Sequence, residues 1–140
     1  MMKHSLMVLG TALAFALPGA AAAQDAMAPA AADLPEVCKP MMHHDTGAMK
    51  LDMTGMDQAH QDLAAGMDTT NAQMIQGMMA EDIDVAFVCA MIPHHQAAIN
   101  MARSELEHGD SAWAKQMAQK VIDAQQKEIE DMLNWLSEQK

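Results

Sequence analysis

Two long stretches with helical periodicity, joined by one tight turn, constrain the fold of this 140-residue chain most strongly. The first covers residues 81–108 and opens on acidic side chains, which suit the positive end of a helix dipole. The second, capped by Asp110 or Ser111, continues to about residue 137. Gly109 lies between them, where we expect the left-handed conformation that commonly ends a helix. Two long helices joined so closely should pack antiparallel.

Residues 57–79 also carry a helical pattern, but Gly66, Asp68 and the Thr69-Thr70 pair interrupt it. We therefore expect two short helices, with Thr70 as the N-cap of the second. Residues 36–56 show no apolar period and are punctuated by proline and glycine, so irregular backbone is expected there. The sequence predicts an all-α fold: an antiparallel helical hairpin or bundle of two long and one or two short helices, over residues 57–138.

The first 23 residues have the form of an export signal. Lys3 supplies a basic start, residues 6–17 are apolar, and three alanines ending at Ala23 offer a cleavage site. The apolar run is short for a membrane span, and no later segment reaches about 18 uninterrupted apolar residues. We expect no membrane insertion and a product in the periplasm or outside the cell. Residues 24–56 would then form an irregular arm rich in methionine and histidine.

The charge balance disfavours one class of partner. Since Lys3 is the only charged residue of the predicted signal, the mature chain carries seven basic and 19 acidic side chains, a net charge of −12. Phosphate binding needs clustered Lys and Arg, so nucleic acid is not an expected partner. An acidic protein can instead concentrate cations through its field.

Cys38 and Cys89 are the only two cysteines. Because disulfides persist in exported proteins, we favour a bond between them, with thiol ligation of a metal as the alternative. The bond would close a loop of about 50 residues and contribute on the order of 4 kcal/mol. It would also tie the arm beside the helix that carries His94 and His95.

That helix places metal-binding side chains on one face. Residues three and four apart share a face, so Met91, His94, Ala98 and Met101 fall in one line. Thioether and imidazole together indicate copper, as Cu(I) suits the sulfur and Cu(II) the imidazole. His95 lies in the neighbouring stripe, about 100° away, and we expect His94 to be the inward of the two. The plain alternative is a methionine-filled core with two polar neighbours.

The last helix offers a complementary set. Glu128 and Gln125 occupy positions where the apolar period calls for a hydrophobic residue. In a hairpin that folds at residue 109, Glu128 and Met132 come close to Met91 and His94. A buried carboxylate must be paired or bound to a cation, and the imidazole or its metal is the nearest candidate. The arm and its continuation add further donor side chains, which are His43, His44, Met53, Met56 and His60.

Two runs resemble a known family. Asp84-Val-Ala-Phe-Val-Cys-Ala-Met-Ile-Pro-His-His-Gln-Ala-Ala-Ile-Asn-Met-Ala102 is similar to the core motif of the domain of unknown function 305 family, and residues 122–136 resemble its second motif. The resemblance covers about residues 57–137. It implies a ferritin-like helical bundle, and exported members are linked to copper binding and copper tolerance. It also implies that His94, His95, Met91 and Met101 face Glu128 and Met132.

We therefore expect a periplasmic copper-binding protein for sequestration, tolerance or hand-over to a copper-handling partner, with silver binding where Cu(I) binds. One alternative is a non-catalytic helical module that binds another protein through a methionine-rich core. A ferritin-like di-iron oxidase is less favoured, because the required Glu-x-x-His pair occurs only once, at Glu105 and His108. No enzymatic activity is expected. Whether the chain forms a homodimer stays open at this stage.

Overall fold

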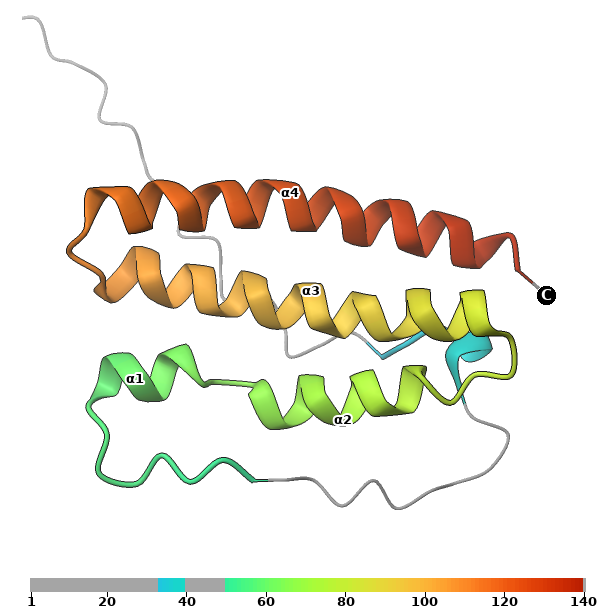
Figure 1. Cartoon of the computed structure of the whole chain (residues 1–140), viewed down its shortest axis with the longest axis horizontal. Coiled ribbons are helices and arrows are strands. Elements are labelled where there is room, and N and C mark those ends of the chain that lie inside the picture. Colours follow the sequence, from blue (N-terminus) through green and yellow to red (C-terminus); the bar gives the residue numbers. More distant parts are fainter. Residues whose placement is uncertain (1–32, 40–49, 140) are drawn as a thin grey trace, which may run out of the picture.

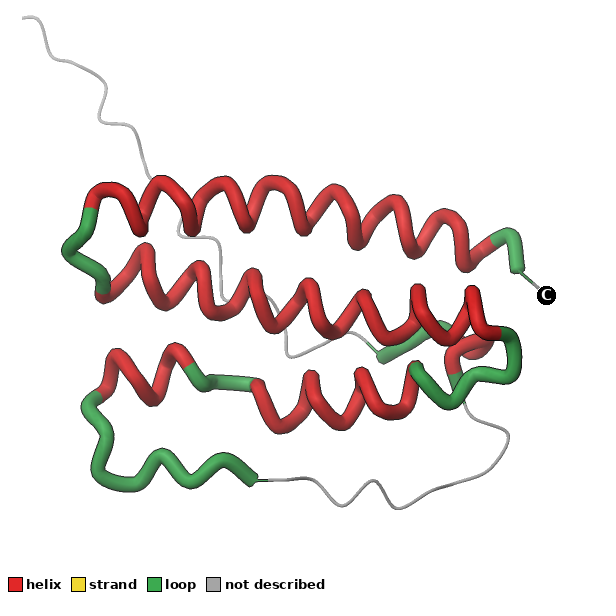
Figure 2. Tube along the Cα trace, viewed as in Figure 1, coloured by secondary structure: helices red, strands yellow, loops and turns green. Residues whose placement is uncertain are grey.

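The computed structural model describes residues 33–39 and 50–139, and in these ranges the protein consists of helices and connecting loops (Figures 1 and 2). The elements are η1 (Glu36–Cys38), α1 (Gln58–Leu63), α2 (Met67–Gly77), α3 (Ile83–His108) and α4 (Ala112–Ser137). The predicted all-α fold, with two long antiparallel and two short helices, is confirmed. Within the described ranges, no helix is long and apolar enough to cross a membrane.

Side chains cap the starts of both long helices, at Ser111, one of the two predicted caps, and at Asp82, which the sequence analysis placed in the first turn. The Asp82 carboxylate accepts hydrogen bonds from the backbone N–H groups of Asp84 and Val85, and the Ser111 hydroxyl accepts one from Ala114. The predicted end of α3 is wrong, because Gly109 has φ −70° and ψ 155°, an extended conformation. An extended residue carries the chain directly to the cap of α4, so this short connection leaves no need for a left-handed one.

The break between the two short helices also differs from the prediction. Gly66, with φ +77°, precedes α2, and Thr70 lies inside the helix rather than at its start. The buried Thr70 hydroxyl donates to backbone carbonyls of the preceding turn, those of Gly66 and Met67. The left-handed conformation available to glycine therefore sets the start of α2, in place of a threonine cap.

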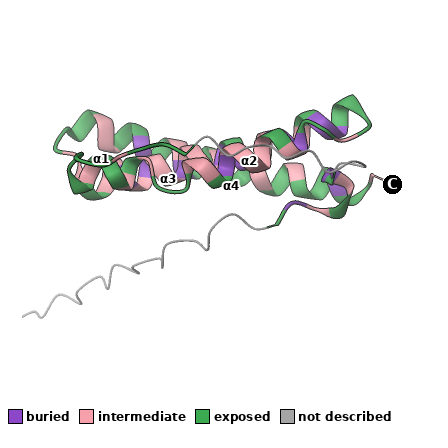
Figure 3. Ribbon diagram, turned by 90° about the horizontal axis from the view of Figure 1, so that it is seen from below, coloured by how far each residue is buried: buried purple, intermediate pink, exposed green. Residues whose placement is uncertain are grey.

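The helices form a single layer with α3 in the middle. α4 runs along one side of α3, while α1 and α2 follow one another along the other side (Figure 1). The edge-on view shows how thin this layer is (Figure 3). α2 approaches α3 closely at Gly77, where a Cβ atom would lie 2.6 Å from the carbonyl carbon of Cys89. Only glycine allows this approach of the two backbones.

Two small clusters of buried side chains stabilise the layer. One lies between α3 and α4 and contains Ile99, Ala102, Ala118 and Ile122. The other lies where η1 covers one face of the layer and contains Leu34, Cys38, Val85, Cys89 and Leu136. The predicted disulfide between Cys38 and Cys89 is confirmed. Residues 34–38, which the sequence assigned to the irregular arm, are thus part of the packed core.

Candidate metal site

His95 is the polar centre of the interface between α3 and α4. Only 8% of this residue is exposed, and both of its ring nitrogens have partners. Nδ1 lies 2.8 Å from the backbone carbonyl oxygen of Met91, one turn earlier in α3. Nε2 lies 2.7 Å from Oε2 of Glu128 on α4. The pair spans 33 residues of sequence and joins the two long helices at the middle of α3.

The partner of Nδ1 fixes the tautomer of a neutral His95. A carbonyl oxygen can only accept a hydrogen bond, so Nδ1 must carry the proton and donate it. The neutral ring then presents a lone pair at Nε2, and an ionised Glu128 presents another on the facing oxygen. Two such groups at hydrogen-bond distance need a cation between them, which is either a proton or a metal ion. In the structure this pair is a hydrogen bond between His95 and Glu128, with a proton shared between the two groups.

A second electron-rich group lies beside this pair. Gln125 shares with Ala118 and Ile122 the stripe of α4 that packs on α3, and it lies one turn before Glu128. Its side-chain oxygen is buried and has no hydrogen-bond partner among residues 33–39 and 50–139. Met91, one turn before His95, and Met132, one turn after Glu128, are half-buried.

The prediction that His94 is the inward histidine is wrong. His94 is exposed, and His95 is the ring that meets Glu128. The cause is the arrangement of the layer, since α4 covers one side of α3 and α2 the other, which leaves the face of His94 uncovered. The two rings are close, with centroids 5.8 Å apart. Met101 lies on the uncovered face with His94, and Met91 lies at the edge of that face, one turn before His95.

The remaining predicted donors lie elsewhere. His60, on α1, is exposed and bonds through Nδ1 to Asp57 at 2.8 Å. Met53 is half-buried and Met56 exposed, both in the loop before α1. His43 and His44 fall outside the described residues. The structure therefore does not bring the His60 group together with His95.

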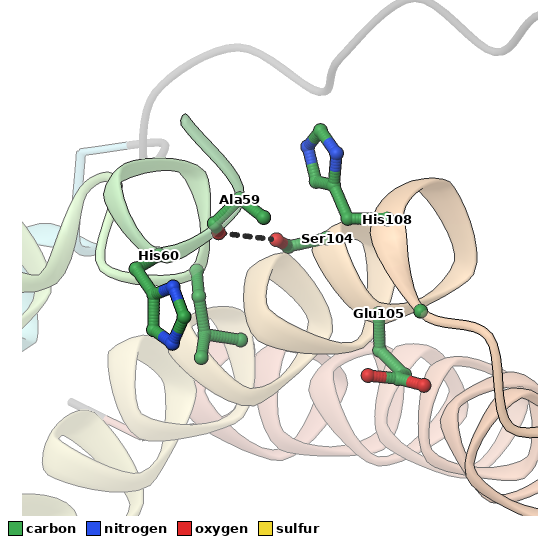
Figure 4. Close-up of a pocket in the computed structure, with 7 residues that line it drawn as sticks. Ala59, His60, Ser104, Glu105 and His108 are labelled. Atoms are coloured by element: carbon green, nitrogen blue, oxygen red, sulfur yellow. Dashed lines mark hydrogen bonds between the residues drawn. The ribbon is translucent and has the colours of Figure 1, made fainter. Parts of the chain in front are cut away.

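A small cavity of about 170 Å³ lies between α1 and the end of α3. Its lining includes His60, Ser104, Glu105 and His108, whose side chains point in different directions (Figure 4). His108 is bonded instead to Asp62, with its Nε2 2.8 Å from Oδ2. The parts of the chain that the structure describes contain no group of three or more His, Cys, Asp or Glu side chains that could hold a metal ion. A metal at His95 would therefore need thioether or amide donors as well.

Gln125 is the site residue that the sequence analysis did not select. The sequence does mark Gln125, because this residue interrupts the apolar stripe of α4 three residues before Glu128. A glutamine in such a stripe is ambiguous, since it can turn toward solvent at the helix edge. Only the structure shows that its oxygen is buried.

The fold and the site together define an all-α protein built on an antiparallel helical hairpin, with a histidine–carboxylate pair bridging the two helices. A family model described as domain of unknown function (DUF305) matches residues 19–136 of the chain. The chain therefore belongs to this family, as the resemblance implied. A comparison with curated proteins finds no match. The ferritin-like grouping stays a prediction, and the family's description assigns no activity.

Proposed function

We propose that this protein binds copper ions through methionine and histidine ligands. The observation that carries the proposal is the arrangement of His95, whose Nε2 faces the Glu128 carboxylate while its Nδ1 bonds to the Met91 carbonyl. Metal-binding histidines usually donate their other ring N–H to a carbonyl or carboxylate, which orients the ring and fixes its tautomer. The Met91 carbonyl has this role for His95.

The donor types suit both oxidation states of copper. His95 and Glu128 offer the nitrogen and oxygen atoms that Cu(II) prefers, and Met91 and Met132 offer the thioethers that Cu(I) prefers. A bound ion needs about 2 Å to each ligand, so the 2.7 Å contact must widen. Glu128 can move, because 58% of its side chain is exposed. Silver is expected where Cu(I) binds.

The outward donors are assigned a secondary role in this proposal. His94 lies close enough to His95 for its ring to join the same ion after a side-chain rotation. Met101 shares the uncovered face of α3 with His94. The further donors His43, His44, Met53, Met56 and His60 would form a separate site or deliver ions to the hairpin. The proposal assigns no catalytic reaction to any of these residues.

The proposal places the protein outside the cytoplasm, after cleavage of residues 1–23. The Cys38–Cys89 disulfide supports this location, because such bonds persist in oxidising compartments. With both thiols in the disulfide, methionine and histidine are the soft and borderline ligands left for copper. Sequestration, copper tolerance and hand-over to a copper-handling protein are the roles that fit such a site.

The direct test is a titration of the purified protein with Cu(II) by calorimetry, and with Cu(I) under ascorbate and a competing chelator. His95→Ala and Glu128→Gln should raise the Cu(II) dissociation constant by about tenfold or more, since each removes one ligand of few. Met91→Leu combined with Met132→Leu should weaken Cu(I) more than Cu(II). Glu130→Gln, at an exposed carboxylate on another side of α4, is the matched control for Glu128→Gln and should change either constant by less than about threefold.

Two results would count against the proposal. A wild-type protein that retains neither ion would exclude copper binding and leave the protein-interaction module as the better description. Binding that His95→Ala leaves unchanged, but that deletion of residues 40–56 abolishes, would move the site from the helical hairpin to the arm. Far-UV circular dichroism on each variant separates loss of a ligand from loss of the fold.

A further inference from the structure

Within residues 33–39 and 50–139, no element covers one face of the helical layer along α3. Ile83, Phe87, Met91, His94, Ala98 and Met101 follow one another at spacings of three and four, so they form a single line on that helix. None of them is Asp, Glu, Lys or Arg, and the same spacing continues the line to Glu105, near the end of α3. Phe87 is 64% exposed. This line lies on the side of α3 opposite Val85, which packs in the cluster that η1 covers.

α4 continues this face with a line of its own. Trp113, Met117, Ala124, Glu128 and Trp135 recur at spacings of four and seven. Trp113 is 71% exposed, and Met117 and Trp135 are also exposed. Glu128 of this line reaches His95, the neighbour of His94, which places the two lines on the same side of the layer. We call the two lines together the open face.

The open face has the size of one side of a stable protein interface. Each long helix has 26 residues and is therefore about 39 Å long at about 1.5 Å per residue. Two neighbouring helices cover a width of about 20 Å, given axes 8–10 Å apart. The footprint is thus roughly 800 Å², which is about what each partner contributes to a standard interface. A domain ordinarily buries such a face in a second layer.

We propose that the open face is the docking surface for a second copy of this chain. Two copies related by a two-fold axis in the plane between them would form two layers around one shared core. Aromatic side chains stand at both ends of the face, with Phe87 and Trp135 at one end and Trp113 at the other. A two-fold axis along the helices places Phe87 of one copy opposite Trp135 of the other. An axis across the helices places Trp113 of one copy opposite Trp135 of the other.

Charge supports a second copy over a strongly charged partner. The chain has a formal net charge of −11, yet the α3 line from Ile83 to Met101 is free of formal charge apart from a protonated His94. Two carboxylates, Glu128 and Asp131, lie along the α4 line. A two-fold axis along the helices sets α4 over the carboxylate-free part of the α3 line in the second copy, so these carboxylates do not oppose one another. His94 lies near the midpoint of α3 and so near the centre of the shared surface.

The test measures self-association of the purified protein. A metal chelator is present throughout, so the result does not depend on whether the protein binds copper. We expect sedimentation and light scattering to give a dimer at micromolar concentrations. Phe87→Glu and Trp113→Glu should each raise the dissociation constant by about 100-fold or more, because each buries a charge in both halves of the interface. Both positions are exposed, so folding should be retained.

Leu133→Glu is the matched control. Leu133 is 41% exposed and lies on the opposite side of α4, so the same substitution there should leave the dimer unchanged. The two tryptophans give a second readout, since both belong to the open face. Their fluorescence should shift to shorter wavelength as the wild-type concentration rises, and should not shift in Phe87→Glu.

Three results would overturn the proposal. A wild-type monomer at all concentrations up to about 100 µM, well above the dissociation constants of specific interfaces, would exclude a functional dimer. A dimer that Phe87→Glu and Trp113→Glu leave intact would place the interface elsewhere. A wild-type monomer that binds a different protein, and loses it with the same two substitutions, would assign the open face to that partner.

Discussion

His95 shows how one residue can serve packing and binding together. It occupies a position surrounded by apolar side chains, where an unpaired imidazole would cost about 1–3 kcal/mol. The Met91 carbonyl and the Glu128 carboxylate satisfy both nitrogens and remove that cost. His94, one residue earlier, has solvent on its side of α3. Substitution of His95 therefore removes two hydrogen bonds from the helix interface, whereas substitution of His94 removes an exposed ring.

We predict that His95→Ala lowers the free energy of unfolding of the metal-free protein by about 2 kcal/mol, through lost hydrogen bonds and a new cavity. At protein concentrations too low for the dimer, His94→Ala should change it by less than about 0.5 kcal/mol, as is usual for exposed positions. Urea unfolding followed by circular dichroism measures both. Equal effects of the two substitutions would contradict the assignment of His95 as the buried ring.

Sequence reasoning at the residue scale brought Glu128 to the His94–His95 stretch but chose the wrong histidine as the inward one. The helical period gives the angle between His94 and His95, and it identified Glu128 as a carboxylate that faces α3. Its expected burial is wrong, because 58% of the Glu128 side chain is exposed at the edge of the interface. The absolute orientation of α3 depends on which neighbours cover it. That is set by α2 at Gly77 and by α4 together, through contacts distant in sequence.

Among the helices, α1 is the one whose stability depends most on contacts with other elements. Six residues are far too few for a helix that is stable alone in water. Two bonds from α3 hold it: His108 pairs with Asp62, and the Ser104 hydroxyl donates to the Ala59 carbonyl. Bonds from Gln58 and His108 hold the pKa of the Asp62 carboxyl below its usual value. The stability of α1 should therefore depend on pH.

The sign of this dependence follows from the direction of the shift. A carboxyl with a lowered pKa in the folded state stabilises the fold above its unfolded pKa of about 4, and this stabilisation is lost as the pH falls. We expect the free energy of unfolding to fall more steeply between about pH 5 and pH 3 for wild type than for Asp62→Asn. Asp123→Asn, at an exposed carboxylate on α4, should keep the wild-type slope. Equal slopes for Asp62→Asn and wild type would contradict the prediction.

Element boundaries were predicted well where a side chain caps a helix and poorly where backbone conformation decides. Ser111 was one of the two caps predicted for α4, and the start of α3 was predicted from the acidic run that contains its cap, Asp82. At Gly109 and Gly66 the glycine permits several conformations, and the surrounding packing selects one. The disulfide predicted that the arm lies beside α3, but the helical turn of η1 could not be predicted, because a three-residue segment is too short to show a period.

Because the helices form a single thin layer with little buried core, the disulfide contributes strongly to the stability of the whole molecule. Each cluster of buried side chains is small, and η1 belongs to one of them through Leu34 and Cys38. The bond joins residues 51 positions apart, so it removes much of the freedom of the unfolded chain. No other covalent link holds η1 against α3.

We predict that Cys38→Ala combined with Cys89→Ala lowers the free energy of unfolding by about 4 kcal/mol. Guanidinium unfolding of wild type and the double variant provides the measurement. Wild type reduced with a strong thiol should match the double variant, which separates the lost bond from the changed side chains. A loss below about 1 kcal/mol would show that packing alone holds η1 in place.

Gly77 and Pro93 are connected through a single carbonyl group. Pro93 has no N–H, so the carbonyl of Cys89 lacks its usual helical donor, and this carbonyl is where the backbone of α2 comes closest. A bulkier residue at 77 would press on it, and an ordinary residue at 93 would turn it back into the helix. The two positions should therefore covary among related chains, with glycine at the first kept wherever proline occupies the second.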